Sequence, residues 1–284
     1  MSSGHVCAFA ARYTAGAAII GSVLISALPA AAEQPWPGEV VADYKISFAG
    51  FDIGWFRFHS RVAARNYALA GSAKLSLMFG GFKWRAESRS TGETRGRLPD
   101  PRAYAFEYQA NSKRGRVNMG FRGGNVSALA LQPNTPPSSK AVPLRKHHLA
   151  SVFDPLSAVM ALTKGGDANP CRKRLAIFDG KQRFDLQFSF AGHETIYGTG
   201  GRNGPVRGFV CRVKYIPIAG YKPSQGVSYM ARTNGIKVIM RPVPVAGLFV
   251  PHEIRVPTMA GDAVLVARRV AISDQRKQRI ALFQ

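Results

Sequence analysis

Hydrophobic and polar residues alternate with a period of two along most of this chain. Residues 39–48 show the pattern most clearly, and residues 82–87, 104–108, 184–190 and 209–215 repeat it. In a strand, successive side chains point to opposite faces of the sheet, so such segments pack one face on a core and expose the other. The alternation therefore predicts a mainly β protein.

Turn-forming residues separate these segments at distances typical of hairpins. They stand at Gly80-Gly81, Pro99-Asp100-Pro101, Gly123-Gly124, Asn234-Gly235 and Gly261-Asp262. Asn234-Gly235 suits a two-residue hairpin, because both central positions of that turn need a positive φ. Strands that follow one another in this way predict a single curved antiparallel sheet, which forms a half-barrel or an open barrel.

The segment near residues 154–163 breaks the alternation. Asp154 is a good N-cap, Pro155 suits the first turn of a helix, and apolar residues follow at helical spacing until Gly165. A short helix that is apolar on most of its surface needs cover on every side. The concave face of the curved sheet would supply that cover, so we expect the sheet to wrap around one short central helix.

The N-terminus has the features of a secretory signal peptide. A short region with one formal charge, Arg12, precedes an apolar stretch at residues 15–28, which is too short to cross a membrane as a helix. Small residues then predict cleavage after Ala32. Residues 1–32 are thus expected to be a signal peptide.

The mature chain, residues 33–284, is expected to be a single β-rich periplasmic domain without a transmembrane segment. Residues 132–148 are rich in Pro, Ser and Lys and predict an exposed loop. A ragged tail is expected after about residue 274.

The central residues resemble a known family. Residues 154–162 (DPLSAVMAL), Cys171 and residues 175–186 (LAIFDGKQRFDL) are similar to an exported bacterial family catalogued as domain of unknown function three-one-zero-eight, and residues 44–54 look like its opening strand and turn. The resemblance implies a β-rich periplasmic protein, shaped in general like the lipoprotein-localisation carriers, whose curved sheet holds acyl chains. The candidate site residues of this motif are Asp154, Pro155, Leu156, Phe178, Asp179, Gly180 and Arg183.

Two cysteines remain after removal of the signal peptide. Cleavage removes Cys7 and leaves Cys171 and Cys211, in a chain sent to an oxidising compartment. This pattern predicts a disulfide bond between them. Metal binding by the two cysteines is the disfavoured alternative, because neither belongs to a closely spaced pair.

Catalytic motifs are absent from the sequence. His193-Glu194 and His252-Glu253 resemble fragments of a zinc-peptidase motif, but no second histidine follows four residues on. No GxSxG sequence is present either. We therefore assign no catalytic, metal-binding or cofactor-binding residue and expect no cofactor.

An exported hydrolase of a wall glycan or peptide is the alternative function. It would use two carboxylates about 5–9.5 Å apart. The candidate acids are Asp179, Asp185, Glu194 and Glu253.

Positive charge is the remaining signal. The chain has 39 Lys and Arg against 16 Asp and Glu, which gives a net charge of 39 − 16 = +23. Such a charge attracts anionic partners. Export argues against nucleic acid and favours anionic lipid, lipopolysaccharide or an acidic envelope polymer, with peripheral membrane contact. The candidate contacts are Lys113, Arg114, Arg116, Arg172, Lys173 and Arg174.

These observations together predict a non-enzymatic protein of the cell envelope. It would bind an amphiphile or an anionic envelope component through an apolar groove and a basic surface.

Overall fold

The computed structural model describes residues 1, 4, 35–77, 80–165, 169–197 and 204–283. Residues Glu33–Gln284 form one compact unit. The expected signal peptide, residues 1–32, lies almost entirely outside the described residues.

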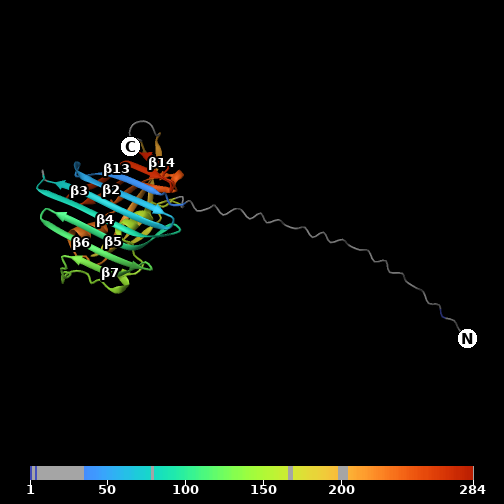
Figure 1. The fold of residues 1–284 in the computed structure, drawn as a ribbon, viewed down its shortest axis with the longest axis horizontal. Coiled ribbons are helices and arrows are strands. Elements are labelled where there is room, and N and C mark those ends of the chain that lie inside the picture. Colours follow the sequence, from blue (N-terminus) through green and yellow to red (C-terminus); the bar gives the residue numbers. More distant parts are fainter. Residues whose placement is uncertain (2–3, 5–34, 78–79, 166–168, 198–203, 284) are drawn as a thin grey trace. The chain divides into compact units, whose positions relative to one another are not determined.

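The strands of the described residues form one antiparallel sheet, which Figure 1 shows. Its order is β7-β6-β5-β4-β3-β2-β1-β13-β12-β11-β10-β9-β8, and β14 pairs with β13. The strands are β1 (Glu39–Phe48), β2 (Phe51–Ala63), β3 (Asn66–Leu77), β4 (Phe82–Arg95), β5 (Leu98–Ala110), β6 (Lys113–Arg122), β7 (Asn125–Gln132), β8 (Arg174–Phe178), β9 (Arg183–Ile196), β10 (Val206–Ala219), β11 (Lys237–Val243), β12 (Leu248–Thr258), β13 (Gly261–Ser273) and β14 (Arg279–Phe283). The prediction of a single curved antiparallel sheet is confirmed.

The alternation of the sequence sets the two faces of the sheet. In β1, the side chains of Ala42, Tyr44 and Ile46 are buried. Their neighbours Asp43 and Lys45 lie on the outer face, where each forms an ion pair with a residue of β2. The inner face therefore supplies the core, and the outer face carries the charge.

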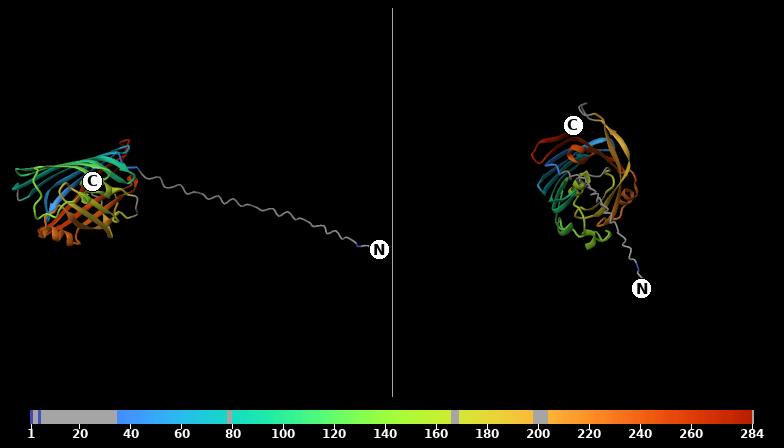
Figure 2. Two further views of the ribbon diagram at one scale, coloured as in Figure 1. Left: turned by 90° about the horizontal axis from the view of Figure 1, so that it is seen from below. Right: turned by 90° about the vertical axis from the view of Figure 1, so that its right-hand side faces the viewer.

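The helix α1 (Pro155–Thr163) lies inside the curve of the sheet, as the right-hand view of Figure 2 shows. Leu156 and Met160 pack into a cluster with residues of β1, β2, β3, β5 and β6 and of β11 to β13. Ala161 and Leu162 pack into a second cluster with residues of β8 to β11. The sheet thus wraps around the helix as predicted, and burial on both sides explains why the helix is apolar all round.

The two ends of the sheet, β7 and β8, are joined by the residues that lead into α1. The amide of Val152 donates to the carbonyl of Gly124 in the β6–β7 turn, 3.0 Å away. The amide of Phe153 donates to Ala176 O of β8 at 2.8 Å, and the amide of Phe178 donates back to Phe153 O at 3.0 Å. We call Val152 and Phe153 the strap. It pairs with part of the β8 edge, which would otherwise expose unpaired backbone groups.

Two short 3₁₀ helices, η2 (Lys146–Leu149) and η3 (Pro244–Ala246), lie in connections, and the segment from Pro133 to Arg145 has no regular structure. Most residues of that segment are exposed, as expected for a loop. None of the helices in the described ranges is long and apolar enough to span a membrane.

A second helix was not predicted. The helix α2 (Gln225–Arg232) begins after Ser224, whose hydroxyl accepts from the amide of Val227 at 3.3 Å. Asn234-Gly235 lies between α2 and β11, so the prediction of a hairpin turn there is wrong. The reason is that Ser224 starts a helix in the connection, and this connection replaces a tight turn between β10 and β11.

Two other expectations were also wrong. The segment Pro99-Asp100-Pro101 lies inside β5, because β6 pairs with β5 only from Ala103 onward and the two prolines have no partner strand on that side. The chain after residue 274 is not a ragged tail, because residues 279–283 form β14 on the edge of β13.

Candidate functional site

The motif residues at the start of α1 form a buried polar network. The Asp154 carboxylate accepts from the amides of Leu156 and Ser157 at 3.0 Å and from the hydroxyls of Ser157 and Ser90 at 2.5 and 2.9 Å. Tyr67 of β3 hydrogen-bonds to the Ser157 hydroxyl at 2.8 Å. Burial raises the pKa of Asp154, although these hydrogen bonds oppose the shift. The network fixes α1 to β3 and β4, and its complete burial keeps it away from a ligand in solvent.

The second half of the motif forms the turn between β8 and β9. The Asp179 carboxylate accepts from two backbone amides of the turn at 2.8 and 2.7 Å. Gly180 has a φ of +98°, and a Cβ placed there would lie 2.3 Å from Val117 of β6. Phe178 is fully buried beside the strap. These residues close the sheet, so their contacts are those of a structural turn.

Three of the candidate acids of the hydrolase alternative form ion pairs with basic residues. Asp185 is paired with Arg183 at 2.5 Å and with Arg174 at 2.6 Å. Glu194 and Glu253 each pair with a basic residue, at 3.2 and 3.0 Å. Within the described ranges, no group of three or more His, Cys, Asp or Glu side chains is placed to hold a metal ion. The geometry gives no support to an Asp/Glu pair acting on a shared substrate.

The predicted disulfide is present. The Cα atoms of Cys171 and Cys211 are 5.1 Å apart, and both residues are fully buried. This distance lies within the range that a disulfide allows. The bond ties the chain that leaves α1 to β10, and its role is structural.

Lys173, one of the six basic candidates, binds the C-terminal end of α1 instead of lying free on the surface. The Lys173 ammonium donates to the carbonyls of Ala161, Leu162 and Lys164 at 2.9, 2.9 and 3.0 Å. A cation at this position satisfies the last carbonyls of α1 and complements the helix dipole. The prediction of Lys173 as a surface contact is therefore wrong. Of its neighbours, Arg172 is exposed and Arg174 is paired with an acid.

The other three candidates belong to β6. Arg114 and Arg116 lie on its outer face and line a groove, whereas Lys113, exposed at the start of the strand, has the register of the inward-facing Val117. This outer groove has a volume of about 700 Å³ and includes Arg114 and Arg116, the latter paired with Glu107 at 3.0 Å. Trp55, 46% exposed, also lines it. The strand register sets one row of directly opposite residues across β1 to β6: Lys45, Trp55, Lys74, Arg85, Gln109 and Arg114. Local sequence pattern identified only the last of these, because the row depends on pairing between strands.

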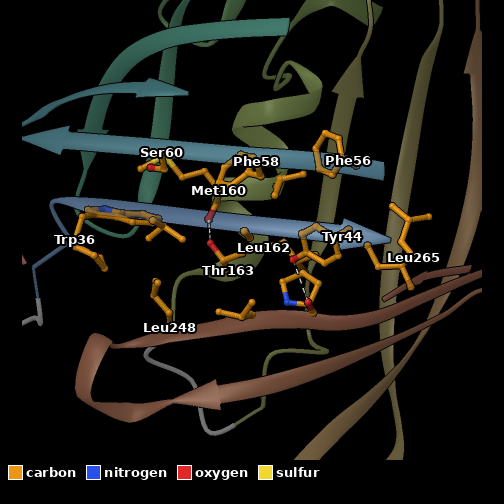
Figure 3. Close-up of a pocket in the computed structure, with 17 residues that line it drawn as sticks. Trp36, Tyr44, Phe56, Phe58, Ser60, Met160, Leu162, Thr163, Leu248 and Leu265 are labelled. Carbon is orange, nitrogen blue, oxygen red and sulfur yellow. Dashed lines mark hydrogen bonds between the residues drawn. The ribbon is translucent and has the colours of Figure 1, made fainter. Parts of the chain in front are cut away.

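An apolar pocket lies between α1 and the inner face of the sheet, as Figure 3 shows. Trp36 and Leu248 stand toward one end of it and Tyr44 and Leu265 toward the other. Its volume is about 100 Å³. The lining residues are Trp36, Pro37, Val40, Ala42, Tyr44, Phe56, Phe58, Ser60, Val159, Met160, Leu162, Thr163, Leu248, Val250, Pro251, Ile254 and Leu265.

Two hydroxyl groups of the pocket lining donate to backbone carbonyls. The Tyr44 hydroxyl donates to Pro251 O at 3.0 Å, and the Thr163 hydroxyl donates to Met160 O at 2.9 Å. These two donors are therefore already satisfied, and apart from the Ser60 hydroxyl the surface left for a guest is mainly hydrophobic. For scale, an apolar cavity of about 150 Å³ holds one benzene molecule. The pocket thus has room for the end of an aliphatic chain.

The fold and the site together define a β-barrel-like protein with a central helix and an internal apolar pocket. The chain belongs to the family described as "Protein of unknown function (DUF3108)", whose profile matches residues 43–268. The comparison with curated proteins gives no match.

One solved structure is similar to this chain. It is the crystal structure of a β-barrel-like protein of domain of unknown function DUF1849 from Brucella abortus. The TM-score is 0.45 at 8% sequence identity, and the match covers 84% of this chain and 99% of that chain.

Proposed function

We propose that this protein is an exported, non-enzymatic protein of the bacterial cell envelope that binds an amphiphile. The apolar pocket beside α1 is the observation that carries the proposal. The signal-peptide pattern of residues 1–32 supports export, because it combines a short apolar stretch with small residues before a cleavage site.

The pocket takes the end of an acyl chain in this proposal. Each buried methylene contributes about 0.8 kcal/mol, so three or four of them contribute about 3 kcal/mol. That energy alone corresponds to a dissociation constant weaker than about 1 mM. Useful affinity therefore needs further contacts from the polar end of the ligand, or a shift of α1 that lengthens the pocket.

The outer groove supports a second part of the same proposal, contact with an anionic surface. Lys74, Arg85 and Arg114 stand in one row there beside the half-exposed ring of Trp55. Tryptophan is favoured at the interface between membrane and water, and each basic residue near an anionic leaflet contributes about 1 kcal/mol. The groove thus has the chemistry of a peripheral membrane contact.

Two substitutions of Val159 test the pocket in opposite directions. Val159 belongs to α1 and lines the pocket. V159F fills the space and is expected to abolish binding of decanoate, whereas V159A enlarges it and is expected to preserve or strengthen binding. Isothermal titration of the exported protein with decanoate measures both, and mass spectrometry of the purified protein identifies lipid that it retains.

Circular dichroism of the two variants shows whether each keeps the β-rich fold. Equal decanoate binding by the exported protein, V159F and V159A would contradict the proposal. So would the absence of any bound lipid together with no measurable decanoate binding.

A further inference from the structure

A separate cleft of about 190 Å³ opens where β12 and β13 part. The two strands pair only between Glu253–Thr258 and Gly261–Val266. Beyond this point β14 takes the edge of β13 instead, starting at Val270 opposite Phe283. The cleft left between them includes Arg241, His252, Arg268, Arg269, Tyr197 and Phe283.

Arg241 is the unusual residue of this cleft. It is only 7% exposed, and its Nε atom is buried without a hydrogen-bond acceptor. Its guanidinium lies over the ring of Phe283, 4.1 Å from the centroid. No carboxylate pairs with it in the part of the chain that the structure describes. Burial lowers the pKa of Arg241, as expected for a buried cation that no anion stabilises. An unpaired buried charge is strongly unfavourable.

Three further basic residues, His252, Arg268 and Arg269, line the cleft. His252 and Arg268 are the extra residues of two β-bulges, one in β12 and one in β13. Bulges redirect side chains and are common beside functional sites. Arg268 and Arg269 are exposed, so they stand where the cleft meets solvent. None of the lining residues is acidic.

We propose that this cleft binds a phosphate group, with Arg241 as its buried ligand and Arg268 and Arg269 at its mouth. A guanidinium presents a planar fork of donors that matches phosphate oxygens. Three arginines around one cleft favour a multiply charged anion over a single carboxylate. This inference goes beyond the proposed function, because it stands without the apolar pocket.

The phosphate can come from two sources. One is free inorganic phosphate, and the other is the phosphorylated head of an amphiphile. The second source has structural support, because Val250 and Pro251 line both the cleft and the apolar pocket. A chain in the pocket and a head in the cleft would then lie on either side of the same segment of β12.

Titration calorimetry with inorganic phosphate and with hexyl phosphate tests the cleft. R241M removes the charge and keeps much of the volume, and we expect at least about tenfold weaker binding, a loss of about 1.4 kcal/mol. R241K is expected to bind at intermediate strength, because it keeps the charge and loses the fork. R122M is the matched control, because Arg122 is exposed on β6 and lines none of the cavities described.

Thermal unfolding in phosphate-free buffer gives an independent readout. R241M is expected to raise the melting temperature there, because it removes the unpaired charge, and to lose the further rise that phosphate gives the exported protein. Tighter binding of hexyl phosphate that V159F abolishes would assign the phosphate to an amphiphile, and equal binding of the two probes would assign it to the free ion. Either result supports the site. Binding of neither probe, or R241M binding as well as R122M, would overturn it.

Discussion

Asp154 shows how one residue determines the position of a whole helix. Its carboxylate satisfies two amides at the start of α1 and also accepts from Ser90, which belongs to β4. An N-cap carboxylate usually contacts only its own helix, but here the Asp154 carboxylate also binds the sheet through Ser90. This arrangement buries the carboxylate, and no cation pairs with it among the residues that the structure describes, so burial raises its pKa.

This burial predicts a pH dependence of stability. The folded state raises the pKa of Asp154 above its ordinary value of 3.8, so it holds a proton that the unfolded chain releases more readily. Asp154 therefore favours folding most below pH 3.8, and this contribution is lost as the pH rises through the folded pKa. D154N keeps an oxygen for the amides and cannot ionise. Urea unfolding from pH 4 to 8 is expected to show the stability of D154N, relative to the unsubstituted protein, rising with pH. A constant difference would refute this.

At the scale of elements, the turn between β8 and β9 and the strap join the two ends of the sheet. Gly180 permits this contact, because its positive φ and its approach to Val117 both exclude a side chain. The strap holds the other side of β8 by backbone hydrogen bonds. Contacts of this kind let a sheet with free edges behave as a closed layer around α1.

The substitution Gly180→Ala measures how much the contact between the β8–β9 turn and β6 contributes to the free energy of unfolding. Gly50 supplies a matched control, because it has a similar φ of +88° and an added Cβ there would meet no atom within 4 Å, whereas one at Gly180 would meet Val117 at 2.3 Å. Both substitutions carry the cost of a left-handed backbone, about 1 kcal/mol or more. G180A is expected to cost a further 1–3 kcal/mol or so through overpacking. Denaturant unfolding of both variants gives the difference between their free energies of unfolding. Equal losses of stability would show that Val117 moves aside without an energetic penalty.

Particular elements show how far the sequence alone could predict this structure. Alternation identified the strands and Asp154-Pro155 identified α1, because those signals are local. The helix α2 was missed because it is only eight residues long and its sequence, which includes Gly226, gave no strong local signal, although Val227 and Met230 on one of its faces are half-buried. The apolar pocket was expected as a groove but not placed, because β1 and β12 meet there from opposite ends of the chain. Arg241 and its cleft gave no signal, since a buried arginine in a strand looks like any other basic residue.

At the scale of the whole molecule, the row of basic residues and the apolar pocket lie on opposite faces of the sheet. The row from Lys45 to Arg114 is on the outer face of the sheet, while the apolar pocket is on the inner face. In the proposed function, a net charge of +23 would attract the protein to an anionic surface over a long range, and the outer groove would be the side that contacts it.

The outer groove predicts a specific loss of vesicle binding. Replacing Arg85 and Arg114 by Gln removes two charges from the groove, which is expected to weaken binding to phosphatidylglycerol vesicles by about 2 kcal/mol, or roughly thirtyfold. Arg122 and Arg212 are exposed outside the groove, and the same double replacement there is the control for net charge. Cosedimentation at several salt concentrations measures both pairs. Equal weakening by both pairs would mean that total charge, rather than the groove, directs the contact.

The order of strands has a consequence for how the chain reaches its fold. From β8 through β13, then from β1 through β7, each strand pairs with the next one in sequence, apart from the single junction of β13 with β1. The fold is thus a simple meander that has been circularly permuted, with its seam at the strap and its chain ends near the middle of the sheet. Strands β1 to β7 can pair without the rest of the chain, whereas β1 must keep one edge unpaired until β13 is in place. Among the strands that the structure describes, β1 and β13 are therefore the only neighbours that lie far apart in sequence, and their pairing is the step expected to limit the folding rate.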